Sequence, residues 1–476
     1  MKVRGKACVV GSGPNGLAAA IVLAEGELDV EVYEAEPTPG GAVRSMELTL
    51  PGFVHDFGAA VFPLGAGSPF FASLPLAQYR LEWIHSPAPL AHPLDDGTAV
   101  VLERTLDDTQ SSLGAADGEA WRRLLAPFVE NWPEFIREVL RPVRVIPRHP
   151  WLMARFAANG LSSARTVARR FRSERTRALF AGLAAHSVLA LDEPLSAAFA
   201  MLMAIPAHAV GWPIARRGAQ SITNALCDHL ASLGARVRVS SRVDSLASLT
   251  QCDLTVCDVT PRQFLKIAGD RLSESYQRRL ARFRYGSGVF KVDYALNSPI
   301  PWRAAECLRA ATVHLGGSFE EIAGSEKAVR NGCHADRPFV LLAQPSLFDP
   351  SRAPAGKHTA WAYCHVPNGS KVDLLERVEN QIERFAPGFR EVVLARRVLA
   401  PADLEAMDAN LVGGDVSGGA MNISNILSRP TWQHYATSAK DLYLCSASTP
   451  PGGGVHGMSG YHAAKTALSR FNRMRR

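Results

Sequence analysis

The first forty residues contain the feature that most restricts the fold of this chain. A short apolar run, residues 7–10, leads into Gly11-Ser12-Gly13-Pro14-Asn15-Gly16, and residues 17–24 continue as an apolar helical pattern. A second apolar run, residues 30–33, ends at Glu34. This order of strand, glycine turn, helix, strand and acid is the fingerprint of a βαβ unit that binds a dinucleotide. We therefore expect a Rossmann-type α/β domain.

The residues of the glycine turn each have a physical reason for their place. Gly11 permits the tight turn, Gly13 lets the backbone approach a pyrophosphate, and Gly16 lets the helix pack closely on the strand. The first helical turn includes Pro14 and Asn15. Its backbone amides and the positive end of the helix dipole favour phosphate groups. The turn thus predicts where the diphosphate of a cofactor binds.

The residues after the second strand distinguish FAD from NAD. Glu34, with Ala35 beside it, lies where a carboxylate accepts hydrogen bonds from ribose hydroxyls. In Gly40-Gly41-Ala42-Val43-Arg44, two glycines can wrap a loop over a pyrophosphate, and Arg44 can add a charge-assisted contact. A simple NAD dehydrogenase does not need this loop. No second glycine fingerprint followed by an acid occurs in the sequence, so we predict FAD as the cofactor and no dedicated NAD(P)H domain.

A second glycine-rich turn lies near the end of the sequence. Residues 442–445 are a short apolar run typical of a strand, and three glycines follow at 452–454. From residue 457 onward, Met458, Tyr461 and Ala464 are spaced as on a helix. Like the first glycine turn, this strand, turn and helix N-terminus favour an anionic ligand.

With these motifs, the chain resembles the FAD-dependent amine oxidase and phytoene desaturase superfamily. It is especially similar to the phytoene dehydrogenase-related oxidoreductases, the branch that includes the pyridine nucleotide-disulfide oxidoreductase domain-containing protein 2 type. The resemblance runs nearly end to end. Its further segments are residues 52–63, 313–322, 344–350, 413–415 and 442–460.

The resemblance implies roles for residues far from the first motif. It places Gly454, Val455 and Met458 against the isoalloxazine and the ribityl–phosphate chain, and the backbone of Val243 against the adenine. Many members carry an acid just after the last strand, which binds the ribityl hydroxyls. This sequence has Ser446 in that region instead. A serine hydroxyl can still form a hydrogen bond to the ribityl chain.

The resemblance also implies a fold, a Rossmann-type FAD-binding domain interleaved with an α+β substrate domain that has an antiparallel sheet and a helical cap. Residues 290–296 alternate like a half-buried strand of that sheet, and residues 242–246 are predicted as a strand of the FAD domain. We expect the FAD-binding domain to be assembled from three segments, at 1–75, 211–285 and 411–476. The substrate domain then comprises the helical cap at 76–210 and the sheet at 286–410.

Composition supports a folded chain with a localised charge. The 476 residues are 47% hydrophobic and 20% charged, which suits a large core and excludes wholesale disorder. The net charge of +7 is uneven, because residues 137–177 contain eleven arginines and two glutamates. On a helix, Arg165, Arg169 and Arg172 could share one face. That face could contact anionic lipid, hold an acidic substrate or simply be solvated. No recognition module accompanies the charge, so we expect no nucleic-acid partner.

Cysteine usage and the apolar stretches bear on the compartment. The eight cysteines form no dense framework and show no zinc-like spacing, so we expect reduced thiols and no metal site. The apolar stretch at residues 7–24 is interrupted by glycines, unlike a signal peptide or a membrane span. We expect a cytoplasmic protein that at most touches a membrane peripherally, through residues 137–177. Nothing in the sequence indicates its oligomeric state.

Superfamily analogy points to removal of a hydride from a lipophilic small molecule, with FAD as the acceptor. His55 and His456 lie in loops that the resemblance brings near the flavin, which makes them candidate catalytic acids or bases. Each could equally be a histidine that holds loop backbone. A flavin amine oxidase, a redox-neutral flavoprotein isomerase or hydratase, and a non-catalytic FAD-stabilised binding protein remain alternatives.

Overall fold

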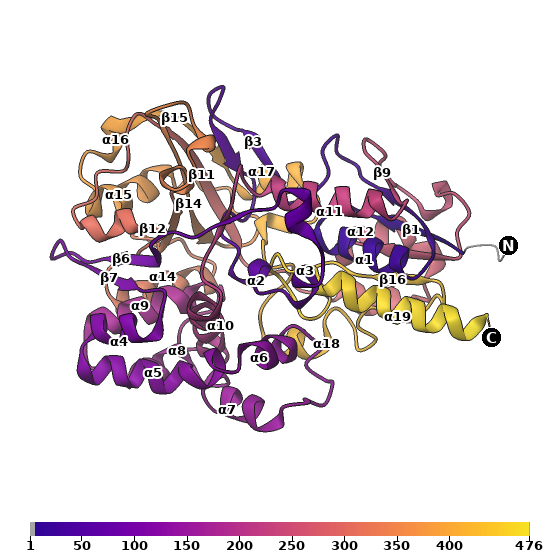
Figure 1. Ribbon diagram of the computed structural model, residues 1–476, viewed down its shortest axis with the longest axis horizontal. Helices are drawn as coiled ribbons and strands as arrows, with labels where there is room; N and C mark the ends of the chain where they lie inside the picture. The colour runs from indigo at the N-terminus through magenta and orange to yellow at the C-terminus, as the bar shows by residue number, and fades with distance from the viewer. Residues whose placement is uncertain (1–4, 476) are drawn as a thin grey trace.

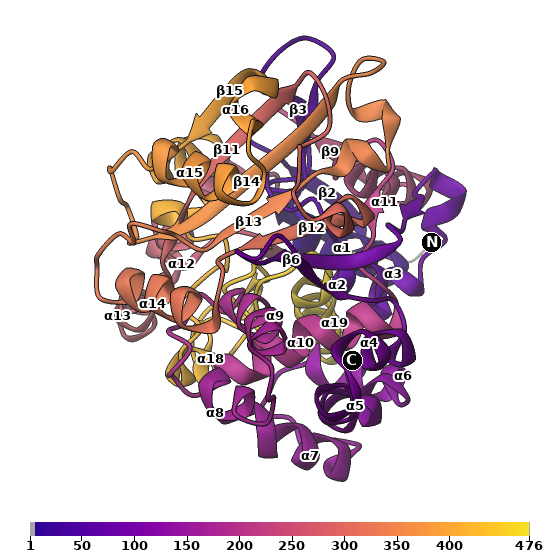
Figure 2. The same ribbon diagram turned by 90° about the vertical axis from the view of Figure 1, so that its left-hand side faces the viewer.

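The computed structural model describes residues 5–475, which form two sheets and a region of helices (Figures 1 and 2). The first sheet is parallel, with the order β16-β10-β1-β2-β9. Its strands are β1 (Lys6–Val10), β2 (Asp29–Tyr33), β9 (Arg236–Arg238), β10 (Leu254–Cys257) and β16 (Leu442–Leu444). The predicted Rossmann-type sheet is confirmed, and it is assembled from three stretches that lie far apart in the sequence.

Helices cover both faces of this parallel sheet, as expected for strands that are apolar on both sides. The helices α1 (Pro14–Glu25), α11 (Gln220–Ser232) and α19 (Met458–Met474) share one apolar core with Val9 and Val256. The helices α12 (Pro261–Ala268) and α13 (Glu274–Ala281) pack on the other face, against Val10 and Cys257.

The crossing of α1 and α19 is close because both helices present small residues there. Gly460 of α19 faces the backbone of Asn15 and Ala19, and a Cβ atom at position 460 would overlap the carbonyl oxygen of Asn15. The two glycine turns that precede these helices are therefore held side by side. Gly457, with a φ of 68°, makes the turn into α19.

The second sheet is mixed, with the order β15-β11-β14-β13-β12-β6-β7. Its strands are β6 (Ala88–Pro93), β7 (Ala99–Leu102), β11 (Gly288–Leu296), β12 (Ala310–Leu315), β13 (Val340–Ala343), β14 (His358–Val366) and β15 (Val393–Leu399). The predicted antiparallel pairing is present, but β6 pairs with β12 in parallel. Two strands from the stretch expected to be a helical cap thus extend the sheet.

The strand β11 differs from the prediction, because all nine of its residues are buried. One face of the sheet packs on α15 (Leu375–Phe385) and α16 (Phe389–Val392). The other faces the helical region and α14 (Phe319–Arg330). A strand covered on both sides cannot be half-buried, so the prediction from the alternation in residues 290–296 is wrong on this point.

The helical region forms the opposite end of the molecule from α15 and β15 (Figures 1 and 2). Aromatic residues such as Trp121, Phe128 and Phe171 fill its core. Its helices are α4 (Leu106–Leu113), α5 (Ala115–Val129), α6 (Trp132–Val139), α7 (Pro150–Gly160), α8 (Ala164–Ala168), α9 (Glu174–Ala185) and α10 (Ser196–Ala209).

Two local predictions are wrong. Residues 242–246 form no strand, and Leu246 instead begins a 3-10 turn, Leu246–Ser248. The proposed arginine face also does not exist, because α8 ends at Ala168, before Arg169 and Arg172. Arg165 is instead held by ion pairs to Glu320 and Asp192.

Short elements connect these layers. They are β3 (Ser45–Glu47), β4 (Val54–Asp56), β5 (Trp83–Ile84), β8 (Ile214–Ala215), α2 (Pro63–Ala66), α3 (Pro69–Ala72), α17 (Pro401–Met407) and α18 (Ile423–Ser428). Within residues 5–475, no helix has the length and apolar character needed to cross a membrane.

Candidate active site

A cavity of about 490 Å³ runs from the carboxyl edge of the parallel sheet to the inner face of the mixed sheet. Thirteen of the sixteen predicted cofactor residues line it. These are Gly11, Gly13, Pro14, Asn15, Glu34, Ala35, Gly41, Ala42, Arg44, Val243, Ser446, Gly454 and Val455. The cavity therefore joins segments that the sequence separates by more than four hundred residues.

The other three predicted residues pack behind the lining. A Cβ atom at Gly16 would overlap the carbonyl oxygen of Gly11, so the glycine is needed for packing. The amide of Gly40 donates to Ser12 Oγ at 3.1 Å. Met458 is buried at the start of α19. These contacts hold the glycine turns in place, and binding of the cofactor by these three residues stays a prediction.

Glu34 is oriented for a ligand by its own surroundings. Its Oε2 accepts hydrogen bonds from the amide of Ser12 at 3.0 Å and from Ser12 Oγ at 2.5 Å. The amide of Glu36 donates to Oε1 at 2.9 Å. These bonds fix the carboxylate at the cavity wall, where the remaining lone pairs can accept from ribose hydroxyls.

The 40–44 loop lies directly against the first glycine turn, because a Cβ atom at Gly41 would lie 3.4 Å from the Cα atom of Gly13, which is van der Waals contact. The two glycine segments therefore form adjacent parts of the cavity wall. Asn15 Oδ1 is buried and has no partner among the described residues. Arg44 Nε donates to the carbonyl of Gly41 at 2.7 Å, which ties the guanidinium to the loop.

Asp258, directly after β10, lies at the N-terminus of α1 and binds a backbone amide of its first turn. The amide of Gly16 donates to its Oδ2 at 2.8 Å, and burial raises the pKa of this carboxyl to about 7. Burial likewise raises the pKa of Asp408, another lining residue, to about 6. At pH 7 Asp258 is therefore partly protonated, which limits the negative charge that a diphosphate would meet, whereas Asp408 is mostly ionised.

The fixed Glu34 carboxylate and the cavity wall built from glycine backbone fit an FAD molecule. Glu34 and Val243 would hold its adenosine end, and Gly11–Asn15 with Gly41–Arg44 would hold the diphosphate. Gly454, Val455 and Ser446 would then face the ribityl and ring end.

The far end of the cavity carries groups that the sequence prediction missed. Lys291 and Asp293 alternate on β11, are buried, and form an ion pair with Nζ–Oδ distances of 2.6 and 2.5 Å. Lys291 Nζ lies 5.5 Å from the ring centroid of Trp361 on β14. Trp361 and Tyr363 stack with their centroids 5.6 Å apart. In the sequence, these groups could have been recognised by a lysine and an aspartate two positions apart inside an otherwise apolar strand.

Two histidines meet at the edge of the same cavity. His186, which lines it, and His314 on β12 place their Nε2 atoms 3.0 Å apart. Burial lowers the pKa of His186 to about 3 and that of His314 well below its ordinary value. Both rings are therefore neutral at pH 7, and one N–H donates to the other ring.

The two predicted catalytic histidines lie outside the lining. His55 Nε2 is 2.8 Å from Thr49 Oγ1, and Nδ1 is 3.6 Å from an oxygen of Asp293. Burial and the nearby Lys291 and Arg352 lower the pKa of His55 to about 3. Its position behind the lysine pair supports a structural role, and direct catalysis by His55 stays a prediction.

His456 contacts backbone on both sides. Its Nδ1 accepts from the amide of Met458 at 3.0 Å, and its carbonyl accepts from the Ser68 hydroxyl at 2.6 Å. Burial lowers its pKa to about 4. These bonds hold the turn into α19, and catalysis by His456 likewise stays a prediction.

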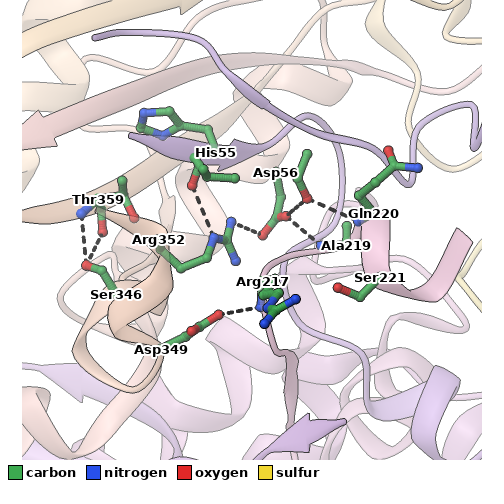
Figure 3. Close-up of polar contacts among 12 residues, drawn as sticks. His55, Asp56, Arg217, Ala219, Gln220, Ser221, Ser346, Asp349, Arg352 and Thr359 are labelled. Carbon is green, nitrogen blue, oxygen red and sulfur yellow. Dashed lines mark hydrogen bonds and ion pairs between the residues drawn. The ribbon is translucent and has the colours of Figure 1, made fainter. Parts of the chain in front are cut away.

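A buried polar cluster fixes the loop that lines the ring end of the cavity (Figure 3). Asp56, just before that loop, pairs with Arg352 at 2.8 Å and accepts from the amide of Ala219 at 2.8 Å. Asp349 accepts from the amide of Arg217 at 2.6 Å. The cluster thereby joins β4, the start of α11 and the turn before β14, and only the fold brings these segments together.

Comparisons with known proteins agree with this geometry. Residues 9–74 match the model of the NAD(P)-binding Rossmann-like domain. Over 98% of the chain and 94% of the relative, the sequence is 25% identical to pyridine nucleotide-disulfide oxidoreductase domain-containing protein 2 of Mus musculus. It is 23% identical to a lycopene-forming phytoene desaturase of Pseudescherichia vulneris, over 97% of the chain and 98% of the relative.

Among solved structures, the fold is similar to that of wild-type putrescine oxidase bound to putrescine. The TM-score is 0.61 at 15% identity, and both chains are covered completely. The predicted resemblance and the predicted FAD cofactor are confirmed. The chain is thus similar over nearly its whole length to pyridine nucleotide-disulfide oxidoreductase domain-containing protein 2 and to a phytoene desaturase, and its fold is similar to that of putrescine oxidase.

Proposed function

We propose that this oxidoreductase removes a hydride from a carbon–hydrogen bond of a lipophilic small molecule, as a dehydrogenase or desaturase does. The observation that carries the proposal is the lining of the cavity beyond the glycine turns. There the wall is built mainly from apolar and aromatic side chains, Phe62, Leu64, Met203, Trp212, Leu341 and Trp361 among them. A wall of this kind binds apolar surface and excludes water.

Bound FAD supplies the hydride acceptor for this chemistry. The residues of the chain position the substrate. Trp361 and Tyr363 give a flat wall against which an unsaturated or alicyclic group can stack. His186 is a neutral base at the cavity edge, and its bond to His314 restricts the orientation of its ring. Because its pKa is about 3, it is a weak proton acceptor, and we assign it the positioning of the substrate.

The charged pair at the cavity wall favours an apolar substrate over an amine. An ammonium group needs a free carboxylate or an aromatic cage. Asp293 already binds Lys291 through both oxygens, and the Lys291 cation lies over Trp361. A protonated amine would therefore meet a like charge beside the aromatic wall.

The test is anaerobic bleaching of the flavin in the FAD-loaded protein. We expect polyene or isoprenoid compounds in detergent to remove the visible flavin absorbance, and primary amines to leave it. His186→Phe should slow bleaching by about a hundred-fold without changing FAD content. Bleaching by amines alone would instead identify an amine oxidase. Bleaching by none of the compounds would contradict the proposal and favour the isomerase or binding-protein alternative.

A further inference from the structure

One surface of the helical region exposes an unusual set of large apolar side chains. Ile146 is 86% exposed and Trp151 is 87% exposed, in the loop before α7 and at its start. The set, named here the apolar tip, consists of Val143, Val145, Ile146, Trp151, Leu161 and Trp432. Large apolar side chains as exposed as Ile146 and Trp151 indicate a surface that contacts something other than water.

The two segments of the apolar tip are joined by a direct contact. The guanidinium carbon of Arg144 lies 4.4 Å from the ring centroid of Trp432, and Arg144 Nη1 donates to the Trp432 carbonyl at 3.3 Å. In both views α7 lies at the outer end of the helical region, away from the mixed sheet (Figures 1 and 2). The tip is therefore one projecting surface.

The charge around the tip has one sign. Residues 139–173 contain eight arginines and no acidic residue, and residues 416–440 contain no acidic residue either. Arg148 and Arg155 are exposed beside Trp151. The acid that precedes this segment in the sequence, Glu138, is buried, and it binds Arg141 and the amide of Arg148. These two segments thus leave no free carboxylate to repel an anion beside the tip.

The tip is also close to the cavity. Gly160, at the end of α7, packs on Ala198 of α10, where a Cβ atom would lie 3.2 Å from the Ala198 methyl. Met203, one and a half turns further along α10, lines the cavity. A single helix therefore separates the exposed surface from the site.

We propose that the apolar tip docks on the surface of an anionic phospholipid bilayer. Trp151 and Ile146 enter the boundary between headgroups and acyl chains, where tryptophan is favoured. Arg144, Arg148 and Arg155 bind the lipid phosphates. The charge that favours this site comes from the loop and α7, not from residues 165–172. The inference goes beyond the proposed chemistry and does not depend on the identity of the substrate.

The test is flotation of the FAD-loaded protein with vesicles. We expect the wild type to float with phosphatidylcholine vesicles that contain phosphatidylglycerol, and to float far less with pure phosphatidylcholine. The double variant Ile146→Ser/Trp151→Ser should reduce the bound fraction at least ten-fold. Arg148→Gln/Arg155→Gln should lower the affinity about five-fold per arginine and remove most of its salt dependence.

Control variants lie at the opposite end of the molecule. Leu394 on β15 is 47% exposed and Arg397 of the same strand is exposed, so Leu394→Ser/Arg397→Gln combines one apolar and one charge change of the same kinds. It should float as the wild type does, and all variants should keep their flavin absorbance. Failure of the wild type to float, or equal flotation of the tip and control variants, would overturn the proposal. So would sedimentation showing a wild-type dimer that Ile146→Ser/Trp151→Ser dissociates, because the tip would then be a protein interface.

Discussion

At the scale of single residues, Glu34 connects the sequence motif to the chemistry of the site. Its carboxylate is held by three hydrogen bonds from the protein, from Ser12 and Glu36, and still faces the cavity. The protein thus fixes the orientation of the acceptor before a ribose arrives. Pre-orientation of this kind lowers the cost of ordering on binding.

Replacement of Glu34 by glutamine should weaken FAD binding. A hydrogen bond to a charged acceptor is worth about 1.5–3 kcal/mol, so the dissociation constant should rise about ten- to hundred-fold. Titration of the deflavinated protein with FAD, followed by flavin fluorescence, measures the change. Glu27→Gln, at an exposed residue on the turn before β2, is the control and should bind FAD as the wild type does. An unchanged affinity for Glu34→Gln would show that the ribose is held elsewhere.

At the scale of elements, the contact between α1 and α19 determines how the two glycine turns face the cofactor. The contact depends on the absence of a side chain at Gly460, because the backbone of Asn15 occupies that space. Backbone atoms cannot move aside as a flexible side chain can. A larger residue must therefore separate the helices.

We expect Gly460→Ala to destabilise the protein by about 3 kcal/mol or more and to reduce its FAD content. Gly324→Ala is a matched control, since Gly324 also lies inside a helix, α14, and a Cβ atom there would meet no other atom within 4 Å. That variant should be neutral or more stable by about 0.5–1 kcal/mol. Urea unfolding of both variants measures the difference. Equal effects would mean that helix propensity alone, and not the crossing, decides the result.

Elements whose signals lie close together in the sequence could be predicted, whereas contacts between residues far apart in the sequence could not. The first turn and Glu34 lie within 24 residues of each other, so their spacing alone predicted the unit. The parallel pairing of β6 with β12 joins residues more than two hundred positions apart, and no local pattern indicates it. His186 and Lys291 meet at the cavity for the same reason. The arginine helix was mispredicted because periodicity suggested a longer helix than the five residues of α8.

At the scale of the whole molecule, burial of neutral histidines links stability to pH. Burial lowers the pKa of His55 and His186 to about 3 and that of His92, His208 and His456 to about 4, and it also lowers the pKa of His314. The unfolded chain binds these protons below about pH 6.5, whereas the folded chain does not. Stability contributed by these groups is therefore complete above pH 6.5 and is lost as the pH falls toward 4.

Four buried carboxyls change the free energy of unfolding in the opposite direction. Burial raises their pKa, so the folded state binds protons more readily and is stabilised as the pH falls; they are Asp258, Asp293, Asp408 and Asp415. The histidines with a lowered pKa outnumber these four carboxyls, so the chain takes up protons on unfolding in this range. We expect the free energy of unfolding to fall between pH 6 and 5, by about 1.4 kcal/mol per pH unit for each net proton taken up. Urea unfolding of the FAD-saturated protein at pH 7, 6 and 5 measures it. His208→Gln should flatten the slope by about 1.4 kcal/mol per unit, and a stability that rises toward pH 5 would contradict the prediction.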